Sequence, residues 1–128
     1  MSYKYTTDVS GILTEADREF YEKNGFFVVR KLIPQKELDQ YHERFVDICH
    51  KRTENTRAMT IMKDVNLKNR QGVDPERVIN KIQDYQGDPV LSNYFRLPEI
   101  LKYVECFTGK DICAVHTMLI NKVCVFFS

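Results

Sequence analysis

Three segments of this sequence carry the start signals, stop signals or apolar spacing of α-helices, and they leave only short stretches for β-strands. These segments are residues 15–24, 35–50 and 98–107. The first has the clearest ends, because Thr14 can cap it, Asp17 stands at the capping-box position and Gly25 follows its last residue. The sequence therefore predicts a helix-rich α+β fold with about three or four strands.

The second and third helical segments each have an apolar stripe. The stripe of the second consists of Leu38, Tyr41, Phe45 and Ile48, and that of the third consists of Ile100, Leu101, Val104 and Phe107. Pro34 precedes the second segment and Gly109 ends the third. The opposite face of the second segment carries polar residues that we expect to be solvated: Glu37, Gln40, Glu43, Arg44 and Asp47.

Strand signals are spread along the rest of the chain. β-branched and aromatic residues predict strands at residues 26–33, 58–67 and 112–127. In the second of these, Met59, Ile61, Val65 and Leu67 alternate in one phase. A polar loop is expected at 68–76, and residues 78–85 fit either a strand or a short helix. Asp88 and Pro89 predict the start of another short helix.

Length and charge limit the classes of function. The 128 residues predict one domain, and 19 Lys and Arg against 18 Asp and Glu give a net charge of +1. This balance gives no support for nucleic-acid binding, which needs a concentrated basic face. The longest apolar stretch, residues 112–121, is too short to span a bilayer. We expect no secretory signal at the N-terminus, no peroxisomal signal at either end, and four reduced cysteines.

Residue chemistry alone shows no catalytic or metal site. His42 and His50 are about 12 Å apart along a helix, and His116 has no Asp or Glu within three residues on either side. No H-x-D, H-x-H or H-E-x-x-H motif and no glycine-rich phosphate loop is present. We therefore expect no catalytic residue and no metal ligand in this chain. On this basis alone, the chain fits a small α+β interaction domain.

Several segments nevertheless resemble one enzyme family, the phytanoyl-CoA dioxygenases (phytanoyl-CoA hydroxylases). The strongest matches are FYEKNGFFVV at residues 20–29, LPEILKYVECFTG at 97–109 and HTMLINK at 116–122. Weaker matches are MKDV at 62–65 and VINKIQDYQ at 78–86. The resemblance covers nearly the whole chain from Tyr5 to Lys122.

The resemblance implies a fold, a reaction and a location. The fold would be the N-terminal part of a double-stranded β-helix (jelly-roll) dioxygenase. The reaction would be 2-hydroxylation of a branched fatty acyl-CoA such as phytanoyl-CoA, in fatty acid α-oxidation. The family's cofactors are Fe(II), 2-oxoglutarate and ascorbate, none of which we expect this chain alone to bind tightly. The location would be the peroxisome.

The sequence departs from the family after Lys122. Family members continue to an H-x-D pair, a distal His and an Arg, whereas here a divergent tail at 123–128 takes that place. A complete jelly-roll needs eight strands, for which the helices and loops leave too little chain. We therefore expect a single incomplete domain over 1–128, inactive alone, as an alternative or truncated product. The rival is a non-catalytic isoform that acts as an interaction module or has no function.

Two site residues follow from the resemblance. Lys81, in NKI, and Met118, in HTML, match positions that contact 2-oxoglutarate in the family. A lysine ammonium is suited to bind a dicarboxylate. Without the resemblance, Lys81 would be an exposed lysine and Met118 an ordinary core methionine. The tail is apolar and uncharged, so we also expect self-association through a C-terminal edge strand.

Overall fold

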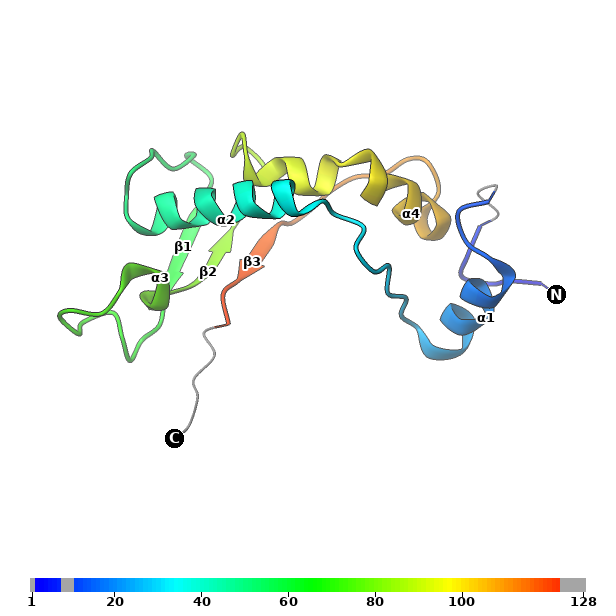
Figure 1. The fold of residues 1–128 in the computed structure, drawn as a ribbon, viewed down its shortest axis with the longest axis horizontal. Coiled ribbons are helices and arrows are strands. Elements are labelled where there is room, and N and C mark those ends of the chain that lie inside the picture. The colour runs from blue at the N-terminus through cyan, green and yellow to red at the C-terminus, as the bar shows by residue number, and fades with distance from the viewer. Residues whose placement is uncertain (1, 8–10, 123–128) are drawn as a thin grey trace. The chain divides into compact units, whose positions relative to one another are not determined.

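The computed structural model describes residues 2–7 and 11–122, so the predicted tail at 123–128 lies outside the described residues. The chain divides into two compact units: Met1–Gln35 with Phe95–Ala114, and Lys36–Tyr94 with Val115–Ser128. The prediction of one domain over 1–128 stays a prediction. The elements (Figure 1) are α1 (Glu15–Asn24), α2 (Gln35–Cys49), β1 (Thr60–Lys63), α3 (Pro75–Val78), β2 (Ile79–Gln83), the 3₁₀ helix η1 (Leu91–Arg96), α4 (Pro98–Thr108) and β3 (Met118–Ile120).

Helix α1 begins and ends where its sequence signals predict. The Thr14 hydroxyl accepts a hydrogen bond from the Asp17 backbone N–H, and the Asp17 carboxylate accepts one from the Thr14 N–H, which completes a capping box. Gly25 adopts a left-handed conformation with φ 75° and donates its N–H to the Tyr21 carbonyl. These local signals set the two ends of α1, and ring contact of Tyr21 with Phe107 packs the helix against α4.

The strand predicted at residues 26–33 is wrong. This segment forms no strand and carries Lys31 at φ 54°, which is incompatible with continuous β geometry. Its aromatic residues form ring contacts instead: Phe26 lies 5.2 Å from Phe20, and Phe27 lies 6.4 Å from Tyr103 of α4, between ring centroids. The segment therefore partly covers Phe27, Val29, Leu32 and Ile33 without forming a strand, while Phe26 and Val28 stay exposed.

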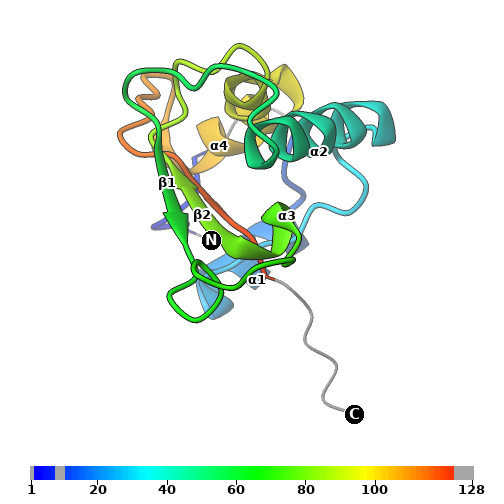
Figure 2. The ribbon, with the colours of Figure 1, turned by 90° about the vertical axis from the view of Figure 1, so that its left-hand side faces the viewer.

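The second unit contains an antiparallel three-stranded sheet in the order β1-β2-β3. Figure 2 shows α2 on one side of this sheet. The core of this unit consists of buried residues from α2, from β2 and from the segment after β2. They are Phe45, Ile48 and Cys49, then Ile79 and Ile82, and then Tyr85 and Leu91. No described helix is long and apolar enough to cross a membrane.

A β-bulge in β2 sets which side chains face α2. Lys81 pairs with Met62, but Ile79 pairs with Lys63, so Asn80 is an extra residue in β2. Because of this extra residue, Ile79 and Ile82 can both be buried on the α2 side although they are three positions apart. Lys81 then faces the other side of the sheet.

The other predicted elements differ in extent. Of the strand predicted at 58–67, only β1 forms. Val65 lies in a turn with 74% of its surface exposed, so the prediction that it alternates in phase with Met59 and Ile61 is wrong. The described part of 112–127 contains only β3 as a strand. The ambiguous stretch at 78–85 contains β2, which follows the one-turn helix α3. As predicted, a short helix follows Asp88.

Candidate functional site

The two residues predicted to contact 2-oxoglutarate lie on neighbouring strands and on the same face of the sheet. Lys81 in β2 pairs with Ile120 in β3, and Met118 pairs with Gln83. Directly paired residues share a face, and residues two apart in a strand share it too. Lys81 and Met118 are therefore diagonal neighbours on the face turned away from α2.

We call this surface the open face, and the pairing places six side chains on it. They are Thr60, Met62, Lys81, Gln83, Met118 and Ile120. The three apolar members keep between 44% and 59% of their surface exposed, so the described residues leave this face uncovered. Met118 is thus not a core methionine in this structure.

Lys81 is half-buried and makes no ion pair with any carboxylate in the described part of the chain. Its neighbours on the sheet are Met62, Ile120 and the Gln83 amide side chain, none of which carries charge. An ammonium without a counter-ion among the described residues is suited to bind an anionic group.

The three histidines have different surroundings. His42 is exposed on α2. His116 lies just before β3 with its Nδ1 3.5 Å from an oxygen of Asp84, and its side chain is 75% exposed. His50 directly follows α2, and its Nε2 lies 3.1 Å from the Glu76 carboxylate and 3.9 Å from that of Asp74.

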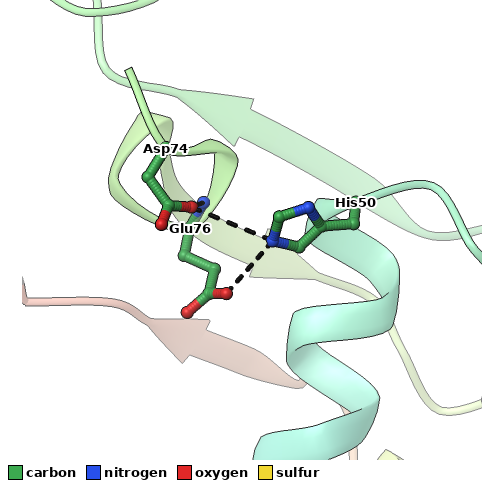
Figure 3. A group of neighbouring side chains, drawn as sticks. All are labelled: His50, Asp74 and Glu76. Carbon is green, nitrogen blue, oxygen red and sulfur yellow. Dashed lines mark hydrogen bonds and ion pairs between the residues drawn. The ribbon is translucent and has the colours of Figure 1, made fainter. Parts of the chain in front are cut away.

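Figure 3 shows His50 turned toward both carboxylates. The sequence gives little warning of this group, because Glu76 is 26 positions from His50. The only local signal is Asp74-Pro75-Glu76, a helix start that brings its two acidic side chains close together. The ligating atoms of the three residues all lie within 4.8 Å of one another.

The solvated face predicted for α2 is wrong at Arg44. Its guanidinium donates two hydrogen bonds, of 3.0 and 2.7 Å, to one oxygen of Asp88, which is fully buried. Burial alone would raise the pKa of Asp88, but the hydrogen bonds from Arg44 and from the Leu91 and Val90 N–H groups outweigh it and leave this pKa lowered. The pair joins α2 to the start of η1.

Comparison with known proteins identifies relatives along nearly the whole chain. The family model described as phytanoyl-CoA dioxygenase matches residues 21–127. Peroxisomal phytanoyl-CoA dioxygenase of Homo sapiens is 45% identical over 120 residues, and that of Rattus norvegicus 46% over 121. A probable phytanoyl-CoA dioxygenase of Caenorhabditis elegans is 42% identical over 121 residues.

These matches cover 92–94% of this chain but only 35–38% of the relatives. The chain therefore spans about a third of the length of the curated relatives it matches.

Proposed function

Because this chain belongs to the phytanoyl-CoA dioxygenase family, we propose that it supplies part of the 2-oxoglutarate site of a phytanoyl-CoA 2-hydroxylase. The observation that carries this proposal is the position of Lys81 on the open face, diagonal to Met118, where this half-buried residue has no counter-ion within 2–7 and 11–122. In this role the Lys81 ammonium binds a carboxylate of 2-oxoglutarate, and the Met118 thioether contacts its methylene carbons. When bound, 2-oxoglutarate supplies two electrons as it is decarboxylated to succinate.

The described residues do not fit the family's iron ligands. The sequence has no H-x-D motif, and His50, Asp74 and Glu76 lie at the end of α2 and on α3, on the other side of the sheet from Lys81. The proposed hydroxylase therefore needs iron ligands from outside the described residues. It follows that this polypeptide alone should not hydroxylate phytanoyl-CoA.

The same proposal extends to the fold, the substrate and the location. The three-stranded sheet would be the first part of a jelly-roll barrel, whose remaining strands would cover the open face. The acyl-CoA substrate and the peroxisomal location come from the family and its relatives. The other candidate is a non-catalytic interaction module, which the exposed Met62, Met118 and Ile120 favour because uncovered apolar surface commonly marks an interface.

Two measurements on the 128-residue polypeptide test the proposal. The first is release of succinate from 2-oxoglutarate with phytanoyl-CoA, Fe(II) and ascorbate, where we expect no turnover above a control without protein. Turnover would contradict the assignment of the iron ligands to another part of the enzyme.

The second measurement is binding of 2-oxoglutarate by ligand-observed NMR, because we expect only weak binding to this chain alone. Lys81→Ala should weaken binding about ten- to a hundred-fold, because a hydrogen bond to a charged group contributes about 1.5–3 kcal/mol. Lys63→Ala is a matched control, since Lys63 is on the neighbouring strand but pairs with Ile79 and faces the α2 side. Equal affinity of the Lys81→Ala variant and the parent chain would contradict the proposal and favour the interaction module.

A further inference from the structure

We infer that His50, Asp74 and Glu76 form a binding site for a divalent transition-metal ion of the Zn²⁺ class, separate from the proposed 2-oxoglutarate site. One imidazole nitrogen and two carboxylates are ligands that Zn²⁺ accepts, with further positions left for water. The inference does not depend on the proposed dioxygenase role, because none of its residues lies on the open face.

The distances between the ligand atoms suit a small cation. In a tetrahedral site with bonds of about 2.0–2.1 Å, neighbouring ligand atoms lie about 3.3 Å apart. The His50 nitrogen is 3.1 Å from the Glu76 oxygen and 3.9 Å from the Asp74 oxygen. Small side-chain rotations would bring all three atoms to coordinating distance, and Figure 3 shows them already turned toward one another.

Each ligand is held by secondary structure. His50 donates its backbone N–H to the Val46 carbonyl and so continues the last turn of α2. Asp74 is the N-cap of α3, where one of its oxygens accepts the Glu76 backbone N–H at 2.9 Å. The side chain of Asn121, which follows β3, donates to the Glu76 carbonyl at 2.7 Å. The three ligands are therefore anchored to α2, α3 and β3 rather than to a free loop.

The local charge favours a cation, but not strongly. With neutral His50 the group carries two negative charges, and the C-terminal carbonyls of α2 add a partial negative charge. The same carboxylates, after burial as the main cause, help raise the pKa of the nearby Cys49 thiol to about 11. Lys51, Lys63 and Lys68 line an adjacent cavity of about 330 Å³ and oppose this charge. We therefore expect moderate rather than tight metal binding.

The metal would have a structural role. It would link the C-terminus of α2 to α3 at the start of β2. The three ligand side chains are 29–55% exposed, so water can complete the coordination shell of the metal. The position is on the α2 side of the sheet, whereas Lys81 and Met118 are on the open face. A metal at this position is thus not placed to activate oxygen beside 2-oxoglutarate.

The test is titration of the full chain with Zn²⁺ and with Co²⁺, whose visible absorption reports ligand number. We expect saturable binding of one ion per chain and a rise in the unfolding temperature with Zn²⁺. Mg²⁺ should not displace the bound Zn²⁺ or Co²⁺, because Mg²⁺ prefers oxygen ligands. His50→Gln, Glu76→Gln and Asp74→Asn should each weaken binding at least about ten-fold, since even loss of a supporting partner costs about ten- to a hundred-fold.

The choice of variants protects the fold. Asn is as good an N-cap as Asp, so Asp74→Asn removes the charge and keeps the start of α3. His42→Gln and His116→Gln are matched controls, because each removes one imidazole outside the cluster and should leave binding unchanged. Absence of binding in the parent chain, or equal binding in the Asp74→Asn and His50→Gln variants, would overturn the inference and leave the group as an ion pair only.

Discussion

At the scale of single residues, the contacts that hold the second unit together come from side chains far apart in the sequence. Arg44 and Asp88 are 44 positions apart, and no spacing rule connects them. Lys81, in contrast, is singled out by resemblance, and its proposed role depends on the side of the sheet that it faces. The sequence can therefore point to a single residue such as Lys81. Which side chains surround that residue depends on strand pairing and burial, which only the structure shows.

Asp88→Asn should lower the free energy of unfolding by about 3–5 kcal/mol, because it leaves Arg44 as a mostly buried charge without its partner. The Asn carbonyl oxygen can still accept the backbone hydrogen bonds that begin η1, whereas its NH2 group cannot accept from Arg44, so the variant removes both the charge and the acceptor of this pair. Asp47→Asn, in an exposed pair with Arg52, should cost less than about 1 kcal/mol. Similar costs for the two variants in urea unfolding would contradict this account.

The lowered pKa of Asp88 also predicts a dependence on pH. A carboxyl group whose pKa is lower in the folded state binds fewer protons there than in the unfolded state. The contribution of Asp88 to the free energy of unfolding is therefore present above the pKa of the unfolded state, near 3.8. It is lost as the pH falls through the lower pKa of the folded state. Urea unfolding between pH 2 and 5 should therefore show a smaller loss of stability in Asp88→Asn than in the parent chain.

The cysteines should differ in reactivity according to burial. Cys49 and Cys106 are buried with raised pKa, mainly because burial disfavours the thiolate, whereas Cys113 is exposed. A thiol-alkylating reagent at pH 8 should therefore modify Cys113 well before Cys49 and Cys106, as peptide mass spectrometry can follow. Labelling of Cys49 at the rate of Cys113 would show that the core around α2 opens readily.

At the scale of elements, local signals predicted the three longest helices well and the strands only in part, because β1 and β3 are shorter than predicted and residues 26–33 form no strand. The capping box at Thr14, the proline before α2 and the glycine after α4 act through neighbouring residues, so sequence alone located all three helices. A strand exists only where a partner strand is in register. Residues 26–33 have strand composition but no partner, and they lie against aromatic rings instead. The same limit hid the bulge that places Ile79 and Ile82 on the same side of β2.

Thr14→Ala should lower the free energy of unfolding by about 1 kcal/mol, because it removes the hydroxyl that accepts the Asp17 N–H. Thr14→Ser keeps the hydroxyl and is the matched control, with little expected change. Circular dichroism during thermal unfolding can compare the two. An Ala variant as stable as the Ser variant would mean that tertiary packing, rather than the cap, fixes the start of α1.

At the scale of the whole molecule, the open face is the main exposed apolar surface of the sheet. Met62, Met118 and Ile120 are exposed on it together, and β3 is an edge strand of the sheet. Self-association of the isolated chain stays a prediction, and this exposed face with its edge strand is where we expect it to occur.

Ile120→Glu should reduce self-association, because it places a charge on the open face opposite Lys81, where a cross-strand ion pair is favourable. Val65→Glu is the control, since Val65 is even more exposed but lies in a turn away from the sheet. Sedimentation velocity at several concentrations should show a larger monomer fraction only for Ile120→Glu. A parent chain that is monomeric at all concentrations would contradict the prediction.

The bulge at Asn80 means that β2 carries one more residue than the strict alternation of its two faces needs. Removal of Asn80 would leave Ile79 directly before Lys81, so regular alternation would keep Ile79 and Ile82 on the α2 side and Lys81 on the open face. At the level of the gene, a deletion of three nucleotides at this codon would thus preserve both faces of the sheet, whereas loss of the next codon would remove Lys81 from the open face.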